Sequence, residues 1–394
     1  MRNLILGYKR GWNKWECLSR ALKSIGQEVD VVIKDFDKIE GPYDRIFTVA
    51  ESLLPIQAKL EQLYGLTNVS IEAADILSNK KKMDDFCITI GLQSLIPHSI
   101  IPTSPKHLGY WEDKPFIIKP VIGSGAKPGG LNYISFKNKK EFLSYCLNNK
   151  VFDFFTNNEK GWEDPQFNNR INYYMVQDQL PNSAEVWGPY YYVNDSGVIR
   201  NVLWVRGKIK YSQIDEYRYE TKSFEWMSFR EEDVPDDIKL HADNFYNRLV
   251  ASLHLRNMFF TGPDFYKWED NIKMIDCNPR IGQGLQILDD IHNHKIVSDV
   301  LLENPIRIKK QYLWKISTLK PGKIESVSDI SHIKYLSKTN LNLKPGRIIP
   351  EFQYTSMGGF RQAFVIEGTN DSDMLKTYQT INSQLQDCIT YSTQ

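Results

Sequence analysis

The chain has 394 residues, 41% of them hydrophobic and 12% aromatic, which is enough for two or three domains with packed cores. Its 49 lysines and arginines balance 48 aspartates and glutamates, which excludes the broad basic surface typical of nucleic-acid or anionic-membrane binding. The sequence has no apolar run of about 18 residues, no secretory signal and no CxxC pair among its five cysteines. We therefore expect a cytoplasmic protein without nucleic-acid or membrane partners.

The first hundred residues predict a parallel α/β unit. Apolar runs predict strands over residues 3–7, 28–33 and 44–49. Helical spacing of apolar residues predicts helices over residues 15–25, 51–66, 71–77 and 83–90. Strand, helix and strand in this order are typical of a parallel sheet. The loop after the first strand lacks GxGxxG spacing, which argues against a dinucleotide site.

A strand followed by a glycine-rich loop comes next. Residues 116–120 read as a strand with Lys119 near its end, and four glycines follow between Gly123 and Gly130. Glycines let backbone N–H groups approach a polyphosphate, and lysines add positive charge. The spacing is not that of a P-loop, and a plain flexible hairpin is the alternative interpretation.

The remaining elements are read from the same signals. Strands are predicted over residues 173–180, 185–193, 198–205 and 361–367. Helices are predicted over residues 141–147, 238–255, 285–291 and 371–385, the last capped by Asp371 or Ser372. Residues 156–172 are polar and predict an inserted surface loop, and residues 211–226 predict either a polar, aromatic pocket or a surface loop.

The stretch from residue 258 to residue 284 carries the most chemistry. Residues 260–268 and 273–277 predict a hairpin around a polar turn, which places Asp264 and Asp276 on neighbouring strands. A period of two puts Asn278 on the face of Asp276, and turns Cys277 away into the core. Two carboxylates and an amide oxygen suit Mg2+ and phosphate, and Arg280 would reach the same side to bind an anionic oxygen. Solvated acidic residues on a strand pair are the alternative.

These segments, in this order, resemble the ATP-grasp superfamily of carboxylate–amine ligases over nearly the whole chain. The resemblance is to the branch that includes biotin carboxylase and the L-amino acid ligases. It rests on Asn79-Lys80-x-x-Met83, on residues 116–120 with the glycine loop, on residues 175–186 and, most specifically, on Gly262-Pro-Asp264 with Asp276-Cys-Asn278-Pro-Arg280. The C-terminal residues 346–368 resemble the small β-rich domain of that branch.

The resemblance implies a role for each matching residue. Nucleotide binding falls to Lys80, Lys119, Ser124, Gly125, Gln177, Asp178, Leu180 and Glu185. In such a site the lysines contact the phosphates, the segment from Gln177 lines adenine, and Glu185 holds the ribose. Metal binding falls to Asp264, Asp276 and Asn278, and catalysis to Arg280, Lys119 and Arg206. Family members commonly have glutamates where this chain has Asp264 and Asp276, so the shorter aspartate changes the geometry of a metal site.

The implied fold is α/β and α+β multidomain: an ATP-grasp fold with an N-terminal Rossmann-like α/β domain and a small β-rich C-terminal domain. The expected boundaries are 1–103, 104–305 with a nucleotide lid over about 113–180, and 306–394. The implied reaction uses ATP and Mg2+, with Mn2+ as an alternative, to join a small-molecule carboxylate and an amine, both amino-acid-like. Carboxyphosphate chemistry and a non-catalytic ATP-binding sensor are the alternatives, and a homodimer is common among such enzymes.

Overall fold

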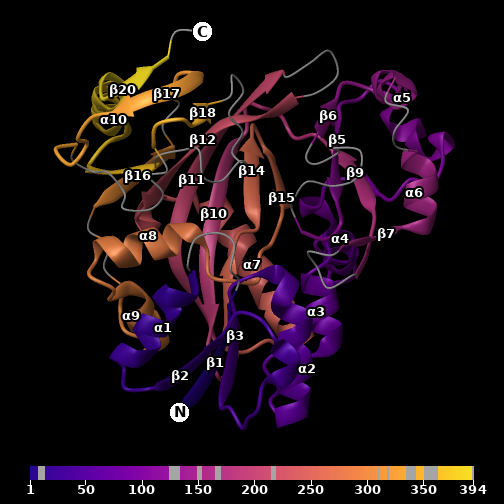
Figure 1. Ribbon diagram of the computed structural model, residues 1–394. Coiled ribbons are helices and arrows are strands. Elements are labelled where there is room, and N and C mark those ends of the chain that lie inside the picture. Colours follow the sequence, from indigo (N-terminus) through magenta and orange to yellow (C-terminus); the bar gives the residue numbers. More distant parts are fainter. Residues whose placement is uncertain are drawn as a thin grey trace. The chain divides into compact units, whose positions relative to one another are not determined.

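The computed structural model describes residues 1–7, 14–123, 134–148, 153–164, 170–213, 219–306, 308, 310–316, 319–333, 343–349 and 363–392. The chain, shown in Figure 1, divides into two compact units. Unit 1 comprises Met1–Leu203 and Pro235–Ile306. Unit 2 comprises Trp204–Val234 and Arg307–Gln394.

Unit 1 begins with a three-stranded parallel sheet in the order β2-β1-β3, which confirms the predicted parallel α/β unit. Its strands are β1 (Arg2–Leu6), β2 (Glu28–Val32) and β3 (Arg45–Thr48). Helix α1 (Lys14–Ser24) packs on β1 and β2, and α2 (Leu54–Tyr64) packs on β3.

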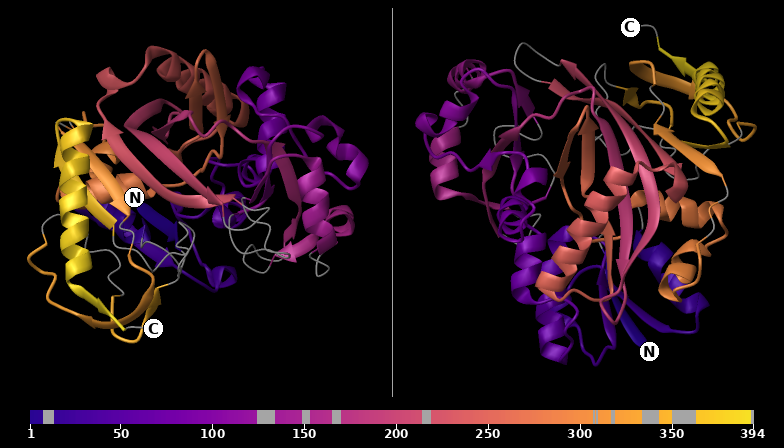
Figure 2. Two further views of the ribbon diagram at one scale, coloured as in Figure 1. Left: turned by 90° about the horizontal axis from the view of Figure 1, so that it is seen from above. Right: turned by 180° about the vertical axis from the view of Figure 1, so that it is seen from behind.

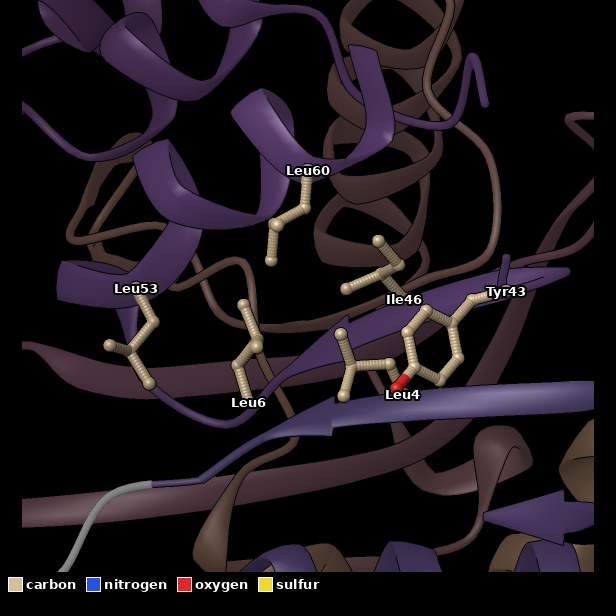
Figure 3. Packing of buried hydrophobic residues seen from close by; sticks show 6 residues of the cluster. All are labelled: Leu4, Leu6, Tyr43, Ile46, Leu53 and Leu60. Carbon is tan, nitrogen blue, oxygen red and sulfur yellow. The ribbon is translucent and has the colours of Figure 1, made fainter. Parts of the chain in front are cut away.

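A core cluster of six buried side chains holds α2 on this sheet. Leu4 and Leu6 alternate along β1 and so point to one face, where Figure 3 shows Leu60 of α2 lying over the sheet. The other members are Tyr43, Ile46 and Leu53. This packing fixes the short 3₁₀ helix Glu51–Leu53 just beyond the carboxyl end of β3, the edge where parallel sheets usually bind ligands.

Two capped helices connect this sheet to the next one. The side chain of Ser70 accepts a hydrogen bond at the start of α3 (Ile71–Leu77), and that of Asn79 does so at the start of α4 (Lys80–Thr89). The prediction that the second helix starts at residue 83 is therefore wrong. The Asn79 side chain accepts from the backbone N–H of Lys82, so the helix already begins at Lys80.

Four further strands of unit 1, which are part of a 12-stranded sheet, pair antiparallel in the order β6-β5-β9-β4. Its strands are β4 (Ser99–Ile100), β5 (Phe116–Pro120), β6 (Ile134–Phe136) and β9 (Tyr174–Asp178). Helices α5 (Lys139–Asn148) and α6 (Phe154–Lys160) contribute aromatic rings beside this sheet, such as Phe142, whose centroid lies 5.1 Å from that of Phe136.

The predicted loop over residues 156–172 is wrong where the structure describes it. Part of it is α6, and part is a two-stranded sheet of β7 (Trp162–Asp164) and β8 (Arg170–Asn172). Its polar residues are not all solvated. Asn158 is 1% exposed and donates to the carbonyl of Tyr174 at 2.8 Å, while Asn172 donates to the carbonyl of Ile122 at 3.0 Å. The polar composition of this segment predicted a solvated loop, but its asparagines are buried and form hydrogen bonds there.

A further group of antiparallel strands lies against a long helix. Strand β10 (Glu185–Val193) pairs with both β13 (Met258–Thr261) and β14 (Asp264–Trp268), and β14 forms a hairpin with β15 (Asn271–Ile275). Helix α7 (Asp236–Leu253) runs along β10, as the rear view of Figure 2 shows. Helices α8 (Gln283–Ile291) and α9 (Ile296–Leu301) pack with α1.

The predicted hairpin around the polar turn is confirmed, but its first strand is broken in two. Gly262 separates β13 from β14 and has a φ of 80°. A Cβ at this position would lie 2.9 Å from the carbonyl oxygen of Asp276, so only glycine fits. The break allows β13 and β14 to pair with different parts of β10.

Unit 2 contains the antiparallel order β11-β12-β16-β19. Strand β11 (Ile199–Gln213) begins in unit 1, and the others are β12 (Tyr219–Phe229), β16 (Gln311–Ile316) and β19 (Ala363–Gly368). Helix α10 (Asp371–Asp387) packs on β16 and β19. Strand β17 (Gly322–Val327) pairs with β18 (Ile348–Ile349) and β20 (Ile389–Tyr391).

Three predictions about unit 2 need correction or completion. The strand predicted to end at residue 205 continues to Gln213, so residues 211–226 are mainly a strand pair, with 214–218 outside the described residues. Asn370, and not Asp371 or Ser372, caps α10 by accepting from the N–H of Asp373 at 2.9 Å.

None of the described helices combines the length and the apolar content needed to span a bilayer.

Candidate active site

Charged side chains of unit 1 meet around one cavity of about 160 Å³. Six of the residues singled out in the sequence line it: Lys80, Lys119, Asp264, Asp276, Asn278 and Arg280. They come from α4, from β5, and from the β14–β15 hairpin with the segment that follows it. Residues 200 positions apart in the chain thus contribute to one polar cavity.

The hairpin brings the two predicted metal-binding carboxylates to one end of a strand pair. Asp264 is the first residue of β14 and pairs with Ile275, the last residue of β15, so Asp276 follows directly. Asp276 has a φ of 54°, a left-handed conformation that lies outside the alternation of a strand. Cys277 also lines the cavity, and its side chain contacts that of the buried Tyr246, in agreement with the expectation that it turns into the core.

Lys119 forms the central ion pair of the cavity. Its side chain is 1% exposed, and its Nζ lies 2.9 Å from Oδ1 of Asp276. Burial and the nearby charge of Asp276 raise the pKa of Asp264 to about 7, although Lys119 opposes this shift. Lys119 thus lies close to both carboxylates, and Lys80 lines the same cavity.

Lys80 approaches the cavity from the first turn of α4. Its Nζ donates to the carbonyl of Gly123 at 2.9 Å, and its backbone N–H donates to the carbonyl of Val121 at 2.8 Å. Burial lowers the pKa of Lys80, while the charge of Asp276 acts in the opposite direction. These bonds hold Lys80 beside the end of β5, the strand that carries Lys119.

Arg280 is engaged by a partner that sequence reasoning missed. Its Nε lies 3.0 Å from Oε1 of Glu51, and both side chains are partly buried. Its Nη2 also donates to Oδ1 of Asn278 at 3.3 Å. The position of Glu51 after the last strand of a parallel sheet is the signal that could have identified it.

Asp84 is the second cavity residue that sequence reasoning missed. It follows Lys80 by four residues on α4, so the two lie on one helix face, which is the available sequence signal. Its Oδ2 accepts from Ser99 Oγ at 2.7 Å and from Gln177 Nε2 at 3.2 Å. Burial raises the pKa of Asp84 to about 6, and Lys119 opposes that shift.

The residues expected to bind adenine and ribose lie near the end of β9 and the start of β10. Gln177 is buried on β9. The carboxylate of Asp178 accepts from Trp111 Nε1 at 2.9 Å and does not line the cavity. Leu180 is half-buried, and Glu185 is exposed opposite Lys267; neither lines the cavity.

The remaining predicted site residues lie elsewhere. Ser124 and Gly125 fall outside the described residues. Arg206 belongs to unit 2, where it forms an ion pair with Asp371, and its guanidinium carbon lies 4.7 Å from the ring centroid of Phe229. Its predicted role in catalysis stays a prediction.

The donor set of the cavity fits a hard divalent cation. Asp264 and Asp276 supply carboxylate oxygens, and Asn278, whose Oδ1 accepts from Arg280, lines the same cavity. Burial raises the pKa of Asp264, and the nearby charge of Asp276 raises it further; a bound cation would offset both effects. Oxygen ligands of this type are those preferred by Mg2+.

Comparison with known proteins was informative at the level of structure. No protein-family model matches the sequence, and no curated protein matches it. An L-amino acid ligase from Bacillus licheniformis superposes with a TM-score of 0.67 at 13% identity, covering 100% of this chain and 98% of that one. A phosphoribosylglycinamide synthetase from Anaerococcus prevotii has a TM-score of 0.60 at 12% identity, with coverage of 100% and 99%.

A third solved structure, N5-carboxyaminoimidazole ribonucleotide synthetase from Thermotoga maritima, has a TM-score of 0.61 at 12% identity, and each chain is covered to 99%. All three structures are ATP-grasp ligases. The chain therefore has the fold of the ATP-grasp carboxylate–amine ligases, as its sequence motifs suggested. Identities of 12–13% extend this conclusion to the fold alone.

Proposed function

We propose that this protein is an ADP-forming ATP-grasp ligase that activates a small-molecule carboxylate as an acyl-phosphate and joins it to an amine, with amino-acid-like substrates. The observation that carries the proposal is the cavity itself. It combines two lysines, an arginine and four carboxylates from distant parts of the chain on an ATP-grasp fold.

The cations of the cavity address the main obstacle to the first step. ATP and a carboxylate are both anions, so Lys80 and Lys119 lower the repulsion between them. The carboxylate oxygen bonds to the γ-phosphorus, the bond from that phosphorus to the bridging oxygen breaks, and ADP leaves. Asp264, Asp276 and Asn278 are the residues that would hold Mg2+ or Mn2+, which supplies charge neutralisation at the phosphates when bound.

The second step joins the two substrates. The amine nitrogen attacks the carbonyl carbon of the acyl-phosphate, the bond from that carbon to the phosphate oxygen breaks, and inorganic phosphate leaves while the amine loses a proton. Negative charge collects on the carbonyl oxygen, and Arg280 lines the same cavity as a donor for it. The chemistry needs no side-chain nucleophile.

Phosphate release tests this function. Release should require ATP, Mg2+, a carboxylic acid and an amine together, in a screen of amino-acid pairs. Asp276→Ala should abolish release, because it removes both a predicted metal ligand and the partner of Lys119. Full activity in this variant would show that the metal assignment is wrong.

Two other results would redirect the proposal. Bicarbonate-stimulated release without an amine would support carboxyphosphate chemistry, a reading favoured by the N5-carboxyaminoimidazole ribonucleotide synthetase among the similar structures. Tight ATP binding without hydrolysis across the whole substrate panel would instead support a nucleotide sensor.

A further inference from the structure

The carboxamide of Gln177 is buried with one end unused. Gln177 lies on β9, is 1% exposed, and donates through Nε2 to Asp84. Its Oε1 is fully buried and accepts no hydrogen bond from any described residue. Leaving such an acceptor unpaired costs about 1–3 kcal/mol. A hydrogen-bond donor on a bound ligand would remove this cost, which gives a physical reason for a glutamine at this position.

Gln177 shares a sheet face with the cavity. Across the β5–β9 ladder, Ile117 pairs with Gln177 and Lys119 pairs with Met175. Positions two apart on each strand point to the same side, so Gln177 and Lys119 face the same side of this sheet. Asp84 touches Gln177 and lines the cavity with Lys119. Gln177 does not itself line the cavity, but Asp84 connects its carboxamide to the cavity wall.

Asp84 determines which end of the carboxamide is unused. Its Oδ2 accepts from the side chains of Ser99 and Gln177, two residues that pair with each other between β4 and β9. An ionised carboxylate only accepts hydrogen bonds, so it faces the –NH2 end of Gln177 and leaves the carbonyl end to the ligand. A neutral amide in place of Asp84 could instead donate to Oε1, and the carboxamide could then turn round.

We propose that Asp84 is a positioning residue that fixes the Gln177 carboxamide with Oε1 presented to an N–H donor of the nucleotide base. The inference rests on the proposed function and on the family resemblance, which implies that the segment from Gln177 lines adenine. The amino group of adenine is such a donor, whereas guanine carries a carbonyl oxygen at the corresponding ring position. Two acceptors would then face each other, so Asp84 makes the site selective for ATP over GTP.

Equilibrium binding tests this role without any turnover. The dissociation constants of ATP and GTP are measured with Mg2+ at about pH 8, by competition with a fluorescent ATP analogue. Asp84→Asn should weaken ATP binding and lower the preference for ATP over GTP about tenfold, which corresponds to one hydrogen bond of about 1.4 kcal/mol. Asp85→Asn is the matched control, because it makes the same change at an exposed neighbour paired with Lys81, and its preference should equal that of the wild type.

A second variant separates positioning from general damage to the fold. Gln177→Leu should lower the preference for ATP to the same extent, and adding Asp84→Asn to it should change the preference no further. The inference is overturned if Asp84→Asn keeps the wild-type preference, or if it produces the same shift with and without Gln177. It is also overturned if the wild type binds neither nucleotide or binds both equally. A wild type that prefers ATP but releases no phosphate refutes the ligase function alone.

Discussion

At the scale of single residues, the cavity holds each of its cations by a contact within the protein. Lys80 donates to the carbonyl of Gly123, Lys119 pairs with Asp276, and Arg280 pairs with Glu51. A polyanionic substrate therefore exchanges partners with side chains that are already ordered, so little side-chain entropy is lost on binding. The same arrangement means that protein carboxylates compete with the substrate for these cations.

The Glu51–Arg280 pair allows that competition to be measured. Glu51→Gln keeps the shape of the side chain and removes its charge, so Arg280 should bind an anion more tightly. We expect the dissociation constant of inorganic phosphate, measured calorimetrically with ADP and Mg2+ present, to fall about fivefold, which corresponds to about 1 kcal/mol for a partly exposed pair. Glu72→Gln, at an exposed position of α3, is the control. Unchanged phosphate binding in Glu51→Gln would mean that Arg280 does not bind this anion.

Glu61 carries a pH-dependent part of the stability. It is 1% exposed on α2 and accepts from Gln57 Nε2 at 2.9 Å and from the N–H of Val69 at 2.8 Å. Burial nevertheless raises its pKa from 4.5 to about 7, because desolvation outweighs these hydrogen bonds. Between these two pKa values the folded state keeps a proton that the unfolded state releases, so stability falls as the pH rises through this window.

Urea unfolding at about pH 5 and about pH 8 checks this prediction. The free energy of unfolding of the wild type should fall relative to Glu61→Gln by up to about 3 kcal/mol between the two conditions, because the variant cannot ionise. Taking the difference between the two proteins removes the contribution of other titrating groups. Equal changes in both proteins would show that Glu61 titrates normally in the folded state.

At the scale of elements, α4 sets the position of two cavity residues at once. Lys80 and Asp84 lie on one face of this helix, and the N–H of Lys80 donates to the carbonyl of Val121 just after β5. The Asn79 cap defines where the helix begins. This backbone hydrogen bond holds the start of α4 next to the end of the strand that carries Lys119. It therefore fixes the spacing of the two lysines.

Removing the cap should loosen the first turn of α4. Asn79→Ala is expected to cost about 1 kcal/mol of stability, since the N–H of Lys82 loses its acceptor. It should also weaken ATP binding, because Lys80 lies in the frayed turn. Asn370→Ala removes the equivalent cap of α10, a helix without cavity residues, and is the matched control. Thermal unfolding and ATP titration of both variants test this; equal ATP affinity in the two would contradict it.

At the scale of the whole molecule, the two units differ in what they contribute. Every described residue that lines the cavity belongs to unit 1. Unit 2 contains the β11-β12-β16-β19 strands, α10 and the ion pair of Arg206 with Asp371. The likeness in fold to the ATP-grasp ligases therefore does not by itself assign a role to unit 2.

ATP with Mg2+ should stabilise the elements that line the cavity more than the rest of the molecule. A ligand at a hundred times its dissociation constant stabilises the state that binds it by about 2.7 kcal/mol. Hydrogen exchange should therefore slow in α4, β5 and the β14–β15 hairpin, and chelation of Mg2+ should reverse the effect. Asp276→Ala should show no slowing. Protection confined to unit 2 would place the nucleotide elsewhere.

Local patterns were sufficient for many of the elements. The parallel start of the chain and the β14–β15 hairpin follow from apolar periodicity and a polar turn. Errors arose where a side chain acts on backbone outside the local pattern. Asn79 and Asn370 cap helices at positions that the apolar pattern does not indicate. Asn158 and Asn172 are buried and make hydrogen bonds to backbone carbonyls in a segment whose composition predicts a loop.

The sequence by itself determined which side chains are the candidates for chemistry: the lysines, the two aspartates and the arginine stand in motifs short enough to be recognised without coordinates. Only the tertiary structure decided which of them meet. Lys119 and Asp276 are 157 residues apart, and Glu51 and Arg280 are 229 apart. Asp276 leaves the strand alternation through a left-handed backbone that no periodicity encodes. Ion pairs and pKa values depend on distances through space, and packing of the two sheets, the helix α4 and the hairpin sets those distances.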